Sequence, residues 1–161
     1  MIPVSFNGKS FKLTPGKHHE LIRDILHNFA PRFAKGAEVL YIGDTGQKED
    51  FFDIKKIRQL GIQVDKHSKW PDVILYLSEK NWLFFIESVT SHGPVDNTRI
   101  IELNDLVKNS TAKTIYISAF PDRKTFHKFL KEISWETEVW IADSPTHMIH
   151  FNGYRFLGPY N

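Results

Sequence analysis

Two neighbouring apolar runs constrain the fold of this chain more than any other feature. They are residues 72–77, DVILYL, and 82–88, WLFFIES, separated by the polar turn SEKN. This spacing predicts a β-hairpin. Both runs are apolar at nearly every position, so neither strand has a polar face to leave in water. The hairpin is therefore expected inside a sheet that is covered on both sides.

The flanking sequence supplies helices to cover such a sheet and strands to extend it. Helical spacing of apolar residues recurs in four segments: 18–33, 49–62, 97–109 and 122–133. Strand-like runs occupy 38–44, 113–120, 137–143 and the stretch from 148 onward. The alternation predicts an α/β fold with a mixed central β-sheet, flanking helices and a crossover connection.

Length and composition indicate one globular domain. A chain of 161 residues with 14% aromatic side chains can bury a sizeable core. We expect residues 1–17, around the Asn7-Gly8 turn signal, to form an arm or hairpin, and 18–161 to form the domain. The absence of cysteine excludes disulfides, thiolate zinc sites and cysteine nucleophiles. No segment is typical of a signal peptide or a membrane span, so a cytoplasmic protein is expected.

The charge distribution contains one local basic region. The formal net charge of +2 does not by itself indicate a nucleic-acid partner. Between 108 and 131, however, one acid, Asp122, stands among basic residues: Lys108, Lys113, Arg123, Lys124, Lys128 and Lys131. Such a run is either an ordinary solvated helix face or a surface that binds phosphates.

Two acids at the ends of the apolar runs are the main candidates for chemistry. Asp72 begins the first run and Glu87 lies near the end of the second. In an antiparallel pair the start of one strand lies beside the end of the next, so both carboxylates are expected at one end of the sheet. Like charges held close need a cation, and Mg²⁺ prefers oxygen ligands. A metal ion held there would polarise a phosphate and activate water.

Pro71-Asp72 followed by Glu87 is similar to the motif of the PD-(D/E)xK nucleases. That motif places a lysine two positions after the second acid, but this chain has Val89 there. Lys48, after the 38–44 strand, is the first candidate to replace it, and Lys69 is the second. His92 could act as a base near the attacking water, or be an ordinary surface or hydrogen-bonded residue.

Two other patterns carry less information. The run GDTGQK ends like a phosphate-binding loop but lacks the first glycine and the hydroxyl residue after the lysine, so no nucleotide cofactor is expected. His147 and His150 are a weak pattern for zinc and are expected to be structural.

Six blocks together resemble the catalytic region of the BsuBI/PstI family of type II restriction endonucleases. In chain order they are VLYIGDTGQK, KWPDVILY, NWLFFIESVTSHGPVD, SAFPDR, WETEVWIAD and HMIHFNGYRFLGPY. The resemblance implies a PD-(D/E)xK fold and Mg²⁺-dependent cleavage of double-stranded DNA at a short palindromic site, with CTGCAG as the family expectation. It places the metal on Asp72 and Glu87, and family members lack the usual lysine, which leaves the third catalytic group open.

Candidate DNA contacts follow from charge and position. Arg99, Arg123, Lys124 and Lys128 are candidates for phosphate contacts, and Ser91 with His92 for contacts near the scissile group. A palindromic site predicts a homodimer on DNA. The resemblance also implies an additional N-terminal helical region that helps bind DNA, and we expect this sequence to have no counterpart of it, which would weaken DNA binding. Two alternatives therefore stay open: an inactive nuclease-like DNA-binding module, and a metal-dependent phosphohydrolase for small substrates.

Overall fold

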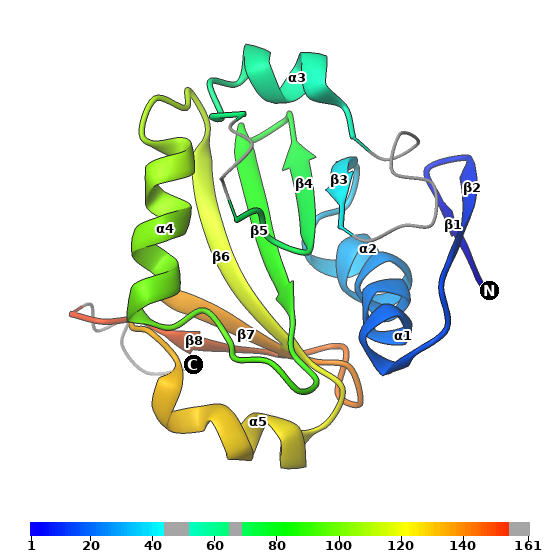
Figure 1. The fold of residues 1–161 in the computed structure, drawn as a ribbon, viewed down its shortest axis with the longest axis vertical. Coiled ribbons are helices and arrows are strands. Elements are labelled where there is room, and N and C mark those ends of the chain that lie inside the picture. Colours follow the sequence, from blue (N-terminus) through cyan, green and yellow to red (C-terminus); the bar gives the residue numbers. More distant parts are fainter. Residues whose placement is uncertain (44–51, 65–68, 155–161) are drawn as a thin grey trace, which may run out of the picture.

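A computed structural model describes residues 1–43, 52–64 and 69–154. Within these residues, one six-stranded sheet in the order β3-β4-β5-β6-β7-β8 forms the centre of the molecule (Figure 1). Its strands are β3 Glu38–Ile42, β4 Val73–Leu77, β5 Trp82–Ser88, β6 Lys113–Phe120, β7 Thr137–Ile141 and β8 Met148–Phe151. A separate hairpin consists of β1 Ile2–Phe6 and β2 Lys9–Leu13.

The helices lie on both sides of the sheet. They are α1 Lys17–Asp24, the π-helical turn Ile25–Phe29, α2 Ala30–Phe33, α3 Ile54–Gln59, α4 Asn97–Val107, α5 Arg123–Phe129 and the short 3₁₀ turn Leu130–Glu132. In Figure 1, α4 lies at one side of the sheet and α1 and α2 lie at the other. The expected long helix over 18–33 thus forms, with a π-helical turn between its two α-helical parts.

The sheet is mixed. Strands β3, β4 and β5 are antiparallel neighbours, β5, β6 and β7 run parallel, and β8 returns antiparallel to β7. The two parallel steps follow helical segments, α4 between β5 and β6 and α5 between β6 and β7. The predicted α/β class with a mixed, helix-flanked sheet is therefore confirmed.

Alternating side chains of the central hairpin fill two cores, as the apolar runs predict. Phe84 on β5 packs with Phe29 of the π-helical turn, at a ring-centroid distance of 6.2 Å. Phe85 points to the opposite face, where it joins the cluster that includes Leu103 of α4. Every residue of β4 is buried. Both faces of the strands are covered, so a continuous apolar sequence is the one that fits.

The N-terminal hairpin packs against the rest of the molecule. Phe11 and Leu13 of β2 belong to the same buried cluster as Phe29. At the hairpin tip, Asn7 and Gly8 adopt positive φ values of 50° and 77°, the backbone that a tight two-residue turn requires. The Asn7 side chain donates a hydrogen bond to the carbonyl of Ala37, just before β3.

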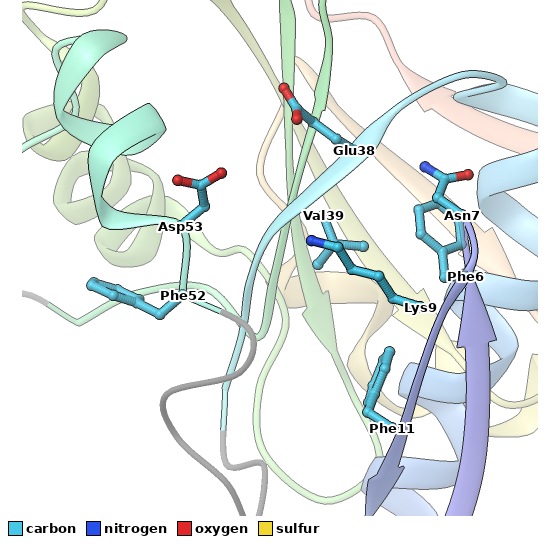
Figure 2. A pocket seen from close by; sticks show the side chains of 8 residues that line it. All are labelled: Phe6, Asn7, Lys9, Phe11, Glu38, Val39, Phe52 and Asp53. Carbon is cyan, nitrogen blue, oxygen red and sulfur yellow. The ribbon is translucent and has the colours of Figure 1, made fainter.

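A small pocket of about 250 Å³ lies between the hairpin, β3 and the start of α3 (Figure 2). Its walls are Phe6, Asn7, Lys9, Phe11, Glu38, Val39, Phe52 and Asp53. None of the predicted site residues that the structure describes lines it. In the parts of the chain that the structure covers, no helix is long and apolar enough to cross a membrane.

Candidate active site

Strand register brings Asp72 and Glu87 to one end of the sheet. Val73 of β4 pairs with Ile86 of β5 in antiparallel register, which sets Asp72 and Glu87 next to each other just beyond that pair. The Asp72 Oδ2 atom accepts a hydrogen bond of 2.7 Å from the backbone N–H of Ser88. The parallel strands β5 and β6 have their carboxyl ends at this same end of the sheet. The carboxyl ends of parallel strands are where α/β proteins commonly bind ligands.

Glu87 already has a cationic partner in the protein. Its Oε1 lies 2.7 Å from Nε of Arg99, and the two side chains are only 12% and 17% exposed. Glu87 continues the series of Leu83 and Phe85, which face α4, and Arg99 lies in the first turn of α4. The face alternation of β5 therefore explains why this arginine can reach the carboxylate.

Arg99 also binds the segment that leads to Asp72. Its Nη1 and Nη2 atoms each donate a 2.9 Å hydrogen bond, to the carbonyls of Lys69 and Trp70 respectively. Nη1 also donates to Oε2 of Glu102 at 3.0 Å. The guanidinium of Arg99 thus connects β5, α4 and the segment 69–70 that precedes β4.

The pKa of Glu87 is raised from 4.5 to about 7, chiefly because burial penalises the charged form. The negative charge of Asp72 raises it further, and a hydrogen bond with the Asp72 side chain acts in the same direction. Arg99 opposes the rise through its charge and its hydrogen bond. Burial and the charge of Asp72 together therefore outweigh the effect of Arg99 on Glu87.

In the metal-free protein, we expect the free energy of unfolding to fall as the pH rises through the range between 4.5 and about 7. In that range the folded chain holds more protons than the unfolded chain, because the pKa of Glu87 is higher in the folded state, so stability declines with pH. Glu87→Gln removes this titration. In EDTA, the stability advantage of the variant over the wild type should grow by on the order of 2 kcal/mol between pH 5 and pH 8.

Urea unfolding of both proteins at the two pH values measures this difference. An advantage that stays constant from pH 5 to pH 8 would show that Glu87 ionises at its ordinary pKa.

Asp72 lines a cleft of about 760 Å³. The cleft is lined by Pro15, Gly16, Lys17, His18, His19, Asp72, Thr90, Ser91 and His92. His18 Nε2 lies 3.4 Å from Asp72 Oδ1, and the backbone carbonyl of His18 accepts a 3.0 Å hydrogen bond from the Ser88 hydroxyl. The structure thus brings the predicted residues Ser91 and His92 into the same cleft as Asp72.

Sequence reasoning did not single out His18. The residue occupies the first turn of a helix that is far from Asp72 along the chain, and its sequence neighbours carry no motif. Only the packing of α1 onto the sheet reveals the contact.

The structure describes only one of the two lysines predicted to replace the lysine of the motif. Lys48 lies outside the described residues. Lys69 is exposed, and its backbone carbonyl is held by Arg99. Val89, at the position where the motif has its lysine, is 1% exposed and belongs to a cluster with Phe120 of β6 and Phe129 of α5. The apolar residue therefore has a packing role at this position.

The basic residues proposed for DNA contacts fall into two groups. Arg123, Lys124 and Lys128 are exposed on α5. The start of α5 borders a second cleft of about 310 Å³, which contains Asp122 and shares Lys17 and Thr90 with the first. Arg99, by contrast, lies against protein groups on several sides. The α5 residues are therefore open to solvent, whereas Arg99 is bonded to protein groups.

The donor set fits a hard divalent cation that is partly coordinated by substrate. No group of three or more potential metal-binding His, Asp or Glu side chains occurs within residues 1–43, 52–64 and 69–154. Mg²⁺ is commonly held by one or two carboxylates, with water and phosphate oxygens completing its shell. Asp72 and Glu87 lie opposite each other just beyond the Val73–Ile86 pair and supply two carboxylates.

The chain is similar to restriction enzymes in both sequence and structure. It is 55% identical to "Type II restriction enzyme BsuBI" of Bacillus subtilis, over 99% of this chain and 51% of the relative. It is 36% identical to "Type II restriction enzyme AplI" of Arthrospira platensis, over 92% of this chain and 48% of that protein. The solved structure of SdaI restriction endonuclease superposes with a TM-score of 0.91 at 41% identity, covering 99% of this chain and 51% of that one.

The chain therefore spans about half the length of the curated relatives that it matches. The sequence model of the BsuBI/PstI restriction endonuclease domain matches residues 2–154, which include Asp72, Glu87, Arg99 and the whole sheet. With the fold and nearly the whole sequence in agreement, the chain belongs to the BsuBI/PstI restriction endonuclease domain family.

Proposed function

We propose that this chain is the catalytic domain of a type II restriction endonuclease, which hydrolyses phosphodiester bonds of double-stranded DNA with Mg²⁺ held by Asp72 and Glu87. The observation that carries the proposal is the carboxylate pair at the end of β4 and β5, beside an open cleft, in a chain of this family. Residues 18–161 would form the nuclease domain, with 1–17 as its N-terminal hairpin. The enzyme would act in the cytoplasm without a nucleotide cofactor.

Bound Mg²⁺ would offset charge on the scissile phosphate and activate the attacking water. Asp72 and Glu87 would hold the ion through carboxylate oxygens, and Ser88 N–H orients Asp72. His92 accepts a proton from the attacking water, while Ser91 donates a hydrogen bond to a phosphate oxygen. The developing charge is stabilised by a lysine, with Lys48 preferred over Lys69.

The exposed face of α5 would guide the DNA backbone towards the cleft. Arg123, Lys124 and Lys128 supply phosphate contacts there, and the second cleft leads from α5 to Lys17 at the edge of the first. We propose CTGCAG as the recognition site and a homodimer as the DNA-bound form, because a twofold assembly matches a palindromic site.

The test is cleavage of a supercoiled plasmid with one CTGCAG site, compared with a matched plasmid that lacks it. We expect Mg²⁺ to give a linear product cut within CTGCAG, no cutting in EDTA, and no cutting of the control plasmid. The assay is run at low salt because binding through phosphate contacts is strongest there and weakens as salt rises.

Two outcomes would contradict the proposal and identify the alternatives. DNA binding in a gel-shift assay with no cleavage in Mg²⁺ or Mn²⁺ would indicate an inactive DNA-binding module. Turnover of a phosphomonoester without cleavage of DNA would indicate a small-substrate phosphohydrolase.

A further inference from the structure

Arg99 occupies an unusual place for a basic residue in a nuclease, because it is largely enclosed by protein groups. Its side chain is 17% exposed. Its backbone N–H donates a 2.8 Å hydrogen bond to Asp96, the N-cap of α4, so the helix start fixes the point from which the side chain extends. The arginine therefore enters the site from a defined position.

The guanidinium joins the two chain segments that carry the metal-site carboxylates. Nε binds Glu87 on β5, while Nη1 and Nη2 bind the last two carbonyls before Pro71 and Asp72. Pro71 has no backbone N–H that could hydrogen-bond to the sheet. The bonds from Arg99 to the carbonyls of Lys69 and Trp70 hold this segment in place instead. One planar group thus sets the position of Glu87 relative to Asp72.

The geometry requires arginine rather than a positive charge alone. A guanidinium presents its donors in a rigid planar fork, which can meet a carboxylate and two carbonyls at once. A lysine at this position would keep the charge beside Glu87 but could not hold both carbonyls in the same arrangement. Charge and positioning can therefore be separated experimentally.

We propose that Arg99 is a positioning residue for the metal site, acting through Glu87 and the 69–70 backbone rather than by binding a DNA phosphate. Four of its five N–H donors already bind Glu87, Lys69, Glu102 and Trp70, so a bidentate phosphate contact would require it to give up at least one of these bonds. The inference rests on the proposed function, because it concerns the same carboxylate pair. It replaces the sequence-based role of Arg99 as a phosphate ligand.

The test compares Arg99→Lys with Arg123→Lys and Arg123→Gln, changes at an exposed arginine on α5. Mn²⁺ affinity is measured by calorimetry without DNA, DNA affinity by gel shift in EDTA, and cleavage under single-turnover conditions. Changes to residues that orient metal ligands typically cost about 10–100-fold in metal affinity or activity, and we expect Arg99→Lys to fall in this range for both. Its DNA affinity should stay within about twofold, since it touches no phosphate.

The Arg123 variants should show the opposite pattern, with weaker DNA binding, a smaller salt dependence for Arg123→Gln, and Mn²⁺ affinity equal to the wild type. Arg99→Met is a second variant. It should lose Mn²⁺ affinity at least as strongly as Arg99→Lys, and a lower thermal midpoint would show the cost of leaving Glu87 without its partner. If Arg99→Met does not fold, Arg99→Lys decides the question, because it retains a cation.

Loss of DNA affinity in Arg99→Lys with unchanged Mn²⁺ affinity would overturn the inference and make Arg99 a phosphate ligand. Unchanged values in all three assays would overturn it as well. If the wild type binds Mn²⁺ but cuts no DNA, the proposed function fails, and the ratio of Mn²⁺ affinities still decides the role of Arg99. If the wild type binds no Mn²⁺ even when duplex DNA is added, both fail.

Discussion

Replacement of Glu87 by glutamine is expected to lower the rate of DNA cleavage by at least about a thousandfold, because a neutral amide is a poor replacement for a carboxylate ligand of Mg²⁺. The glutamine carbonyl can still accept the hydrogen bond that Arg99 now donates to Oε1. The fold should therefore survive, and the buried site should lose the cost of holding a charge. The measurement is single-turnover cleavage at saturating Mg²⁺, with circular dichroism as the check on folding.

Glu102→Gln is the matched control for this variant. Glu102 also accepts a hydrogen bond from Arg99, at 3.0 Å, but its side chain is 38% exposed and it belongs to α4 rather than to a strand of the sheet. The same chemical change there should leave cleavage within a few-fold of the wild type. Equal losses in the two variants, or full activity in Glu87→Gln, would remove Glu87 from the catalytic site.

Replacement of Asp72 by asparagine is expected to cause a loss of similar size, on the order of a thousandfold, since it removes the other charged ligand. The Asn carbonyl oxygen can keep the hydrogen bond from Ser88 N–H, so the turn before β4 should be preserved. The variant should also lower the pKa of Glu87, because the charge of Asp72 is one cause of its elevation. A carboxyl-carbon NMR titration of Glu87 in metal-free protein measures that shift.

Asp53→Asn makes the identical change at an acid that only caps a helix. Asp53 accepts a 3.1 Å hydrogen bond from Lys56 N–H at the start of α3, and asparagine is an equally good N-cap. Cleavage by this control should be unchanged. A pKa of Glu87 that does not move in Asp72→Asn would show that the two carboxyls do not interact, and an active Asp72→Asn enzyme would place the metal elsewhere.

The sequence was sufficient to predict the sheet and its helices because those depend on local pattern. The runs 72–77 and 82–88 are apolar on both faces, which only a covered hairpin satisfies, and the structure has β4 and β5 there. The π-helical turn between α1 and α2 was not predicted. Its residues keep the apolar spacing of a regular helix, so the periodicity does not distinguish the two forms.

The carboxylate pair could be predicted for a similar reason. Once a short turn joins two antiparallel strands, their register follows, and acids at the start of one and the end of the other must meet. The contacts around that pair depend instead on tertiary packing. Arg99 reaches Glu87 only because α4 folds back over its face of the sheet, and His18 approaches Asp72 only because α1 packs near the same edge.

Val89 shows why a missing motif residue need not indicate a lost site. In the general PD-(D/E)xK motif its position carries a lysine, but here the side chain is buried with Phe120 of β6 and Phe129 of α5. A lysine there would have to leave an apolar cluster or bury its charge at a cost of several kcal/mol. Any cationic group must therefore reach the cleft from another segment, which is the role proposed for Lys48 or Lys69.

The central claim is that Asp72 and Glu87 together bind the cation that drives cleavage, and anomalous diffraction from crystals grown with Mn²⁺ and duplex DNA tests it most directly. We predict an anomalous peak within about 2.3 Å of a carboxylate oxygen from each residue, next to a phosphate oxygen of the DNA. Crystals with ordered DNA and no peak between these two side chains, or with the metal bound only at other residues, would contradict the account.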